Sequence, residues 1–245
     1  MGRQIKTKAI VLHEMPIGDY DKRLILLTKE LGKVTAFVKG ARRSNNRMLA
    51  ASQVFVYGEY ILSEGKSSYN VYQANILESF HGLRLDMEDL AHAMYLLEFV
   101  DFVAKEEEEN RVLMQWLLLS LKVIENKYIN TKLVARIFEL KAMSIIGFTP
   151  WLNDCIVCHK EEVTYFSPEN GGVVCKDPGH MVKDLMIIHS GTLHAMRHVL
   201  SQPMKGIYAF ELEDQELIGF EKVMTKFVWA NLNHKFRTLE FLKEL

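Results

Sequence analysis

The chain contains three cysteines, and all three fall in one short segment with a spacing suited to a metal ion. Cys155 and Cys158 form a Cys-x-x-Cys pair, and Cys175 follows beyond a Gly-Gly turn at residues 171–172. Zinc in a structural site is held tetrahedrally by four ligands, usually thiolates and imidazoles, and a Cys-x-x-Cys turn supplies two of them. The spacing therefore predicts a structural zinc site within residues 151–183.

The fourth ligand is open, because Pro178 stands where another cysteine would complete a second pair. His180 is the best candidate, and Asp177 and His159 are the alternatives. The competing interpretation is a degenerate loop whose cysteines stay free thiols. A thioredoxin-like redox pair is disfavoured, because no βαβ pattern surrounds the cysteines.

A second segment whose residues are suited to binding a ligand lies near the N-terminus. Residues 32–39 alternate apolar and polar side chains, as a half-buried strand does. After Gly40, residues 41–47 (the arginine loop) contain Arg42, Arg43 and Arg47 and no acidic residue. A guanidinium presents a planar fork of donors that fits phosphate oxygens. This loop is therefore predicted to contact a nucleic acid, and the alternative is an ordinary solvated loop.

The formal net charge of −1 hides an uneven distribution. Residues 1–50 hold eleven basic and four acidic residues, a balance of +7, whereas residues 51–110 hold three basic and twelve acidic residues, a balance of −9. A basic N-terminal segment on a nearly neutral chain is typical of a module that binds a polyanion. The residues predicted to contact nucleic acid are Lys6, Lys8, Lys22, Arg23, Lys33, Lys39, Arg42, Arg43 and Arg47.

The elements that must position the arginine loop are five short predicted strands. They fall at residues 5–13, 20–28, 32–39, 53–63 and 69–78. Such strands fit a small closed barrel, and the OB-fold is the five-stranded barrel known to bind oligonucleotides. Some aromatic residues of this segment could stack on bases, although most are expected in the barrel core. They are Tyr20, Phe37, Phe55, Tyr57, Tyr60, Tyr69 and Tyr72.

From Leu83 onward, apolar residues recur at intervals of three and four, the pattern of amphipathic helices. We expect three helices before Gly147 and two more at residues 191–201 and 214–233. The fold class is thus a multi-domain α+β protein. Its predicted parts are an OB-fold at residues 1–80, an α-helical domain from residues 81–150 and 184–245, and a zinc-knuckle-like insertion at residues 151–183.

The sequence shows no arrangement typical of catalysis, since it lacks a P-loop, a Gly-x-Ser-x-Gly turn and a His-Glu-x-x-His helix. His194 and His198 stand one helical turn apart, but no carboxylate accompanies them, so a surface or core pair is expected rather than a metal site. No apolar run is long enough to span a membrane, and the N-terminus does not resemble a signal peptide. We therefore expect a non-enzymatic, cytoplasmic protein without a membrane partner.

Several stretches resemble the RecO family of bacterial recombination mediators. They are TKAIVL at residues 7–12, GDYDKRLILLTKELGKV at 18–34, KGARR at 39–43 and RIFELKAMSIIGFTP at 136–150, together with the Cys-x-x-Cys pair and the turn before Cys175. The resemblance covers nearly the whole chain. It implies an N-terminal OB-fold, a helical C-terminal part and, in some members, a four-cysteine zinc knuckle, from which this sequence departs at the fourth cysteine.

The resemblance also implies a function and partners. Members of the family bind single- and double-stranded DNA, anneal complementary strands, partner RecR and engage the acidic tail of single-stranded DNA-binding protein to help load RecA, in the nucleoid-associated cytoplasm. The competing hypotheses are an OB-fold factor that binds RNA or acts in translation, and an enzyme with a zinc-centred site. The enzyme is disfavoured, because no general base stands near the cysteines in a recognisable pattern.

The predicted helix at residues 131–147 is the candidate docking site for that tail. A tail that ends in acids and an aromatic residue needs an apolar slot rimmed by cations. Apolar residues of this helix are Leu133, Ile137, Leu140 and Ile145, and its cations are Lys132, Arg136 and Lys141. The alternative is that Arg136 simply pairs with Glu139 or Glu125.

Overall fold

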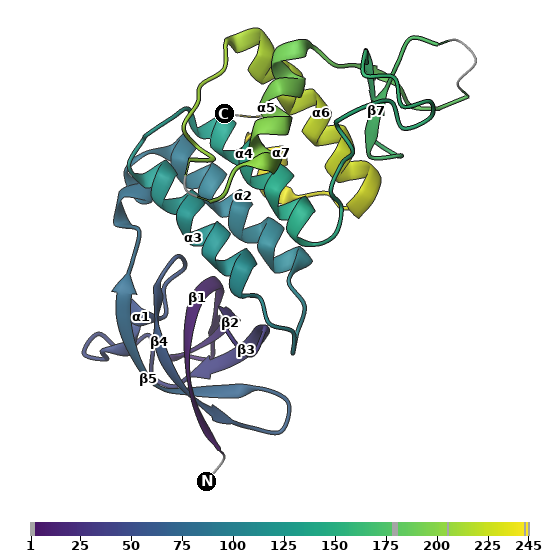
Figure 1. Cartoon of the computed structure of the whole chain (residues 1–245). Coiled ribbons are helices and arrows are strands. Elements are labelled where there is room, and N and C mark those ends of the chain that lie inside the picture. Colours follow the sequence, from purple (N-terminus) through teal and green to yellow (C-terminus); the bar gives the residue numbers. More distant parts are fainter. Residues whose placement is uncertain (1–2, 178–180, 205, 243, 245) are drawn as a thin grey trace. The chain divides into compact units, whose positions relative to one another are not determined.

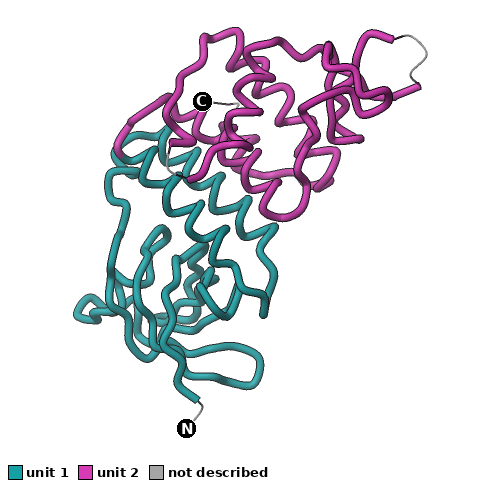
Figure 2. The backbone as a smooth tube through the Cα atoms, viewed as in Figure 1, with its two compact units in different colours: residues 1–125 teal, residues 126–245 magenta. Residues whose placement is uncertain are grey.

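The computed structural model describes residues 3–177, 181–204, 206–242 and 244. The chain divides into two compact units, Met1–Glu125 and Asn126–Leu245 (Figure 2). The predicted domain limits at residues 80 and 150 follow changes in secondary structure, whereas the units follow contacts, so the helices directly after the barrel belong with it. Each unit is described separately below.

A closed five-stranded barrel forms the first part of unit 1, as predicted (Figure 1). Its strands are β1 (Gln4–Ile17), β2 (Asp21–Thr28), β3 (Lys33–Val38), β4 (Tyr57–Glu64) and β5 (Tyr69–Glu78), in the order β1-β2-β3-β5-β4. Neighbours pair antiparallel, except that β3 and β5 close the barrel in parallel through Ala36↔Tyr69 and Phe37↔Asn70. The long β1 makes closure feasible, because it pairs with β4 near its start and with β2 toward its end.

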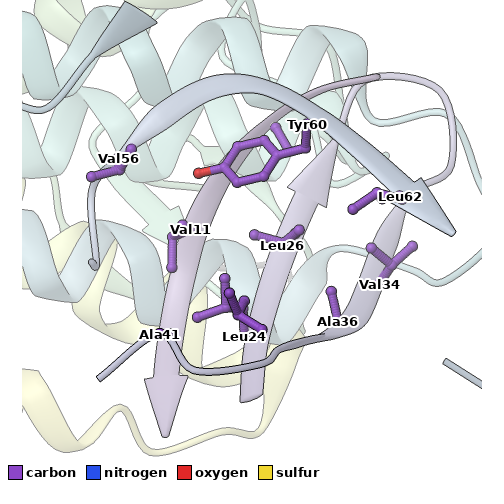
Figure 3. Packing of buried hydrophobic residues seen from close by; sticks show 11 residues of the cluster. Val11, Leu24, Leu26, Val34, Ala36, Ala41, Val56, Tyr60 and Leu62 are labelled. Atoms are coloured by element: carbon purple, nitrogen blue, oxygen red, sulfur yellow. The ribbon is translucent and has the colours of Figure 1, made fainter. Parts of the chain in front are cut away.

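The alternation of apolar and polar residues along these strands fills the barrel interior (Figure 3). Tyr60 is fully buried there, and its hydroxyl donates to the Ala51 carbonyl oxygen at 2.8 Å, which satisfies its polar end. Tyr20 and Tyr72, by contrast, lie on the outside with 52% and 70% of their surface exposed. The interior cluster consists of Ala9, Val11, Leu24, Leu26, Val34, Ala36, Val38, Ala41, Val56, Tyr60 and Leu62.

The connection between β3 and β4 differs from expectation. The fourth strand was expected from residue 53 but begins at Tyr57, because Phe55 has a positive φ of 72° that interrupts extended backbone. A short helix, α1 (Met48–Ala51), which the sequence did not indicate, precedes it. The expected irregularity at Gly58 is present, as the β4–β5 register shifts between Tyr57 and Gly58.

Two helices complete unit 1. After a 3₁₀ turn, η1 (His81–Leu85), comes α2 (Met87–Val103), whose N-cap Asp86 accepts from two backbone amides. α3 (Arg111–Glu125) follows. The acidic run at residues 106–109 between them was expected to be a solvated connection. All four of its residues are exposed, which confirms that prediction, and the backbone of this acidic loop (residues 106–109) also contacts the β2–β3 turn, where Gly32 bridges to Glu106.

Unit 2 contains four helices and a small sheet among the described residues. The helices are α4 (Thr131–Ile145), α5 (Ser190–Ser201), α6 (Asp214–Leu232) and α7 (Arg237–Leu242). α4 packs against both α5 and α6. The sheet, ordered β7-β6-β8, consists of β6 (Tyr165–Ser167), β7 (Gly172–Val174) and β8 (Met186–Ile187) and lies in the cysteine segment. None of the described helices has the length and apolar character needed to cross a membrane.

Gly32 offers a test of how the acidic loop is held on the barrel. Its φ is +71°, and a Cβ there would lie 2.7 to 2.9 Å from backbone atoms of residues 105, 107 and 108. Gly32→Ala should therefore lower the free energy of unfolding of unit 1 by the left-handed backbone strain, about 1–2 kcal/mol, plus about 1–3 kcal/mol of overpacking. Urea unfolding followed by Trp116, with the other two tryptophans changed to Phe, measures this.

Gly18→Ala is the matched control. Gly18 also has a positive φ, +52°, but no atom lies within 4 Å of its Cβ position. The free energy of unfolding of this control should fall only by the part that comes from backbone strain. Equal losses in the two variants would show that the acidic loop moves away from the barrel at little cost.

Candidate nucleic-acid interface and metal centre

One outward-facing row of side chains crosses the barrel from β1 to β5. Arg23 of β2 pairs in register with Met15 of β1 and with Phe37 of β3, and Phe37 pairs with Asn70 of β5. The flanking residue Leu24 points into the core, so by alternation Arg23 and its partners point outward. This row combines a guanidinium with a half-buried aromatic ring on an open surface.

The arginine loop is tied to the turn between β1 and β2. The Arg42 amide donates to the Tyr20 carbonyl at 2.8 Å, and Arg42 Nη1 donates to the carbonyls of Gly18 and Asp19, each at 3.2 Å. These bonds connect two segments more than twenty residues apart in sequence. They hold the loop against the β1–β2 turn, close to the start of β2 and the end of β3.

A cation and an exposed aromatic ring lie together at this place. The Arg43 guanidinium carbon is 4.9 Å from the centroid of the Tyr20 ring, within the range of a cation–π contact. Arg47 is exposed at the start of α1. Such a pairing suits single-stranded nucleic acid, since a base can stack on the ring while cations bind the phosphates.

Three of the nine predicted contact residues are already neutralised by acids. Lys6 lies 3.2 Å from Glu59, Lys33 lies 3.3 Å from Asp101, and Lys22 pairs with Glu14. Within the described parts of the chain, the other six have no carboxylate at ion-pair distance. Five of the six lie toward the Tyr20 end of the β1–β2 and β2–β3 pairs, and we call these five the basic patch: Arg23, Lys39, Arg42, Arg43 and Arg47. Lys8 lies toward the other end of β1, opposite Glu59. Lys66, which was not among the predicted contacts, is exposed in the β4–β5 turn, and the corresponding turn is one of the loops with which OB-folds bind oligonucleotides.

The three cysteine sulfurs form a cluster in unit 2. All three Sγ atoms lie within 4.8 Å of one another, and those of Cys158 and Cys175 are 3.6 Å apart. Two thiolates bound tetrahedrally to one zinc at about 2.3 Å each stand about 3.8 Å apart. Cys155 and Cys175 are buried and Cys158 is partly buried. The cluster therefore fits a tetrahedral metal ion without rearrangement.

Local backbone bonds build this cluster. The Cys155 amide donates to the Lys160 carbonyl and the His159 amide donates to the Cys155 carbonyl, both at 2.9 Å, which closes the Cys-x-x-Cys turn. The Ile156 amide donates to the Val173 carbonyl at 3.0 Å and so ties the turn to β7. Because Cys175 directly follows β7, this pairing brings the third sulfur to the other two.

The environment favours a thiolate at one of these sulfurs. Burial opposes ionisation of Cys155, but the backbone amides of Cys175, Cys158 and Val157 donate to its sulfur and lower its pKa to about 6. The Lys160 amide acts in the same sense on Cys158, but burial and the two neighbouring sulfurs outweigh it and raise the pKa of Cys158. The backbone donors thus favour a thiolate at Cys155, and a bound cation would favour ionisation of the other sulfurs.

The fourth ligand is not among the described residues that form the cluster. His180, the predicted ligand, lies outside the described residues. Asp177 instead pairs with Lys160 at 3.3 Å, and His159 Nδ1 lies 3.0 Å from Asp154 Oδ1. In this arrangement neither alternative ligand reaches the sulfurs, so His180 remains the prediction.

Helix α4 presents less surface than its sequence suggested. Leu133, Ile137 and Leu140, expected to line a docking slot, are all buried in unit 2. Arg136 is only 4% exposed and pairs with Glu139 at 3.0 Å, which is the alternative pairing considered from the sequence.

The two other predicted tail contacts on α4 differ in exposure. Lys132 is exposed, whereas Lys141 is partly buried, donates to the Gln202 carbonyl oxygen at 3.4 Å and has its pKa lowered by burial. Lys132 is therefore the most accessible cation of the predicted tail site.

The sequence matches two protein families along almost its whole length. They are described as Recombination protein O N terminal, matched over residues 1–80, and Recombination protein O C terminal, matched over residues 84–240. Similar full-length proteins carry the name DNA repair protein RecO. One from Thermoanaerobacter sp. is 32% identical over 99% of this chain and 98% of its own length. Another, from Alkaliphilus metalliredigens, is 31% identical over 98% of this chain and 99% of its own length. One from Acetivibrio thermocellus is 29% identical over 98% of this chain and 97% of its own length.

Proposed function

The chain belongs to the RecO family of DNA repair proteins, and we propose that it is a non-enzymatic recombination mediator that binds single- and double-stranded DNA and anneals complementary strands. The observation that carries this proposal is the basic patch on the outer face of the barrel, beside the exposed ring of Tyr20. Cations without acidic partners can bind the phosphates of DNA whatever its base sequence. A mediator that acts on any DNA requires this kind of binding.

We further propose the partners of this activity. With RecR, the protein would help load RecA on DNA coated by single-stranded DNA-binding protein, in the cytoplasm at the nucleoid. Membership of the family supports these partners. Annealing fits the chemistry of the patch, because phosphate contacts leave base edges free to pair.

We propose that the cysteine cluster holds one structural zinc ion, with Cys155, Cys158 and Cys175 as ligands and His180 as the fourth. The sulfur spacing and the amide donors to Cys155 support this assignment. Zinc would fix the turn of the Cys-x-x-Cys pair against β7, and a site closed by four protein ligands leaves no position for a substrate.

We also propose that α4 contributes to docking of the acidic tail of single-stranded DNA-binding protein through Lys132 and Lys141. Arg136 belongs to the predicted set, but its contact with a partner would require the buried pair with Glu139 to open. Removing Arg136 would break this buried ion pair, which costs about 3–5 kcal/mol. Lys132 is therefore the residue on which to test docking without disturbing the fold.

The barrel proposal predicts a defined loss of DNA binding. Changing Arg42, Arg43 and Arg47 together to Ala should weaken binding to single strands of every sequence and slow annealing. The dependence of log K on log salt should flatten by about 2, from about 0.7 per lost phosphate contact. Fluorescence anisotropy over a salt series measures the slope, and a strand-annealing assay measures the rate.

A charge-matched control distinguishes the loss of a specific DNA-binding site from the loss of net positive charge. Lys222, Lys226 and Lys235 are exposed in unit 2, and their triple Ala variant removes the same charge far along the chain. It should keep the wild-type salt slope. An unchanged slope in the arginine variant would place the DNA site elsewhere, and an RNA strand that outcompetes DNA of equal length would favour an RNA-binding factor.

The zinc proposal predicts about one zinc per chain in protein purified without chelator. Cys175→Ser should abolish this content, and His180→Ala should reduce it, whereas His159→Ala should retain it because His159 does not join the cluster. Elemental analysis by mass spectrometry gives the ratio. Less than a tenth of an equivalent after growth in zinc-replete medium would indicate a degenerate loop of free thiols.

The docking proposal predicts that Lys132→Glu weakens binding of a peptide with an acidic, aromatic C-terminus by about fivefold or more, since it replaces an attraction with a repulsion. Binding of naked DNA should not change. Lys127→Glu, an exposed lysine just before α4, is the control. If both variants bind the peptide as the wild type does, α4 is not the docking helix.

A further inference from the structure

A groove in unit 2 lies beside α5 and belongs to neither the barrel surface nor the cysteine cluster. It consists of two hollows that share His194, Arg197 and His198. One hollow, of about 570 Å³, faces residues 149–153, and the other, of about 600 Å³, faces residues 210–212. Both volumes lie in the range of sites that hold small organic groups.

Trp151 borders the first hollow as a flat surface fixed in place. Its ring is 49% exposed, yet Nε1 donates to Asp154 Oδ1 at 3.2 Å. Its backbone is held as well, since its amide donates to the Gly171 carbonyl and its carbonyl accepts from the Val173 amide. A half-exposed indole with a fixed orientation loses little entropy when another flat ring stacks on it.

The charge of the first hollow is positive. Arg197 is oriented by donating to the Leu152 carbonyl at 2.8 Å and to the Asn153 carbonyl at 3.0 Å. Neither partner is an acid, and no described carboxylate lies at ion-pair distance from Arg197. His194 is exposed beside it. Of the described residues that line this hollow none is acidic, whereas Glu211 and Glu216 line the other one.

His198 adds an unsatisfied polar atom to the same groove. Among the described residues, its Nε2 is buried without a hydrogen-bond partner, while the ring packs edge-on against Phe210 at 4.9 Å. A buried nitrogen in this state is uncommon in folded proteins.

We propose that this groove is a second binding subsite for single-stranded DNA, in which a base stacks on Trp151 and a phosphate binds Arg197 with His194 beside it. The proposal rests on the DNA-binding function proposed above and extends it to a second strand. Annealing brings two strands together, and the barrel is proposed to bind one of them. Stacking tolerates every base, so this subsite would not restrict the sequence.

The test uses the intrinsic fluorescence of Trp151 in the full-length chain carrying Trp229→Phe, since Trp116 is fully buried. A short oligonucleotide should quench Trp151 at saturation. Trp151→Ala should slow annealing about fivefold or more, the equivalent of losing about 1 kcal/mol of stacking, and Trp151→Phe should restore most of the rate. Trp229→Ala, a similarly exposed tryptophan on α6, is the matched control and should anneal as the wild type does.

The outcomes separate this subsite from the barrel site. Quenching that persists when Arg42, Arg43 and Arg47 are changed to Ala supports an independent subsite, even if the barrel proposal fails. Wild-type annealing by Trp151→Ala, with the arginine variant defective, overturns the subsite and leaves the barrel proposal standing. Quenching by an acidic peptide but not by DNA overturns it as well, since the groove would then be a peptide site.

Discussion

The interior of the barrel cannot hold an unpaired charged side chain, and this constraint decides where the charges of the first fifty residues lie. A charge inside would cost several kcal/mol, so every lysine and arginine of the strands projects outward or pairs with an acid. The arginine loop follows from the same constraint. β3 ends as Gly40 takes a positive φ and donates to the Asp21 carboxylate at 2.7 Å. Ala41 then seals the core while Arg42 and Arg43 face water.

Unit 2 differs from the barrel, because it buries a charged side chain and pairs it with a side chain of opposite charge. Arg136 and Glu139 lie one helical turn apart on α4, both almost fully buried. A buried pair of this kind contributes little net stability, but breaking it is costly. A residue that looks like a surface cation in the sequence is thus better understood as part of the framework.

Local patterns in the sequence predicted the elements well, and contacts between distant segments were the part they could not predict. Alternation over β1 to β5 and the Cys-x-x-Cys spacing each depend on neighbouring residues, so the barrel and the cysteine cluster were both foreseen. The pairing of Lys33 with Asp101, and the packing of the acidic loop on Gly32, join segments about seventy residues apart. The groove beside Trp151 likewise needs two separate segments, and no spacing rule indicates it. Helical periodicity marked α4 correctly but could not show that its polar stripe is buried too.

Both compact units are continuous in sequence, and this has a consequence for synthesis. All the partners of the barrel and of α2 and α3 within unit 1 are encoded before residue 126. Unit 1 can therefore complete its own contacts on the ribosome while unit 2 is still being translated, since domains generally fold as units from the N-terminus. The exposed β-edges of a half-made barrel are then short-lived. A nascent chain stalled after α3 would already display the basic patch, whereas one stalled within β5 would leave β3 without its closing partner.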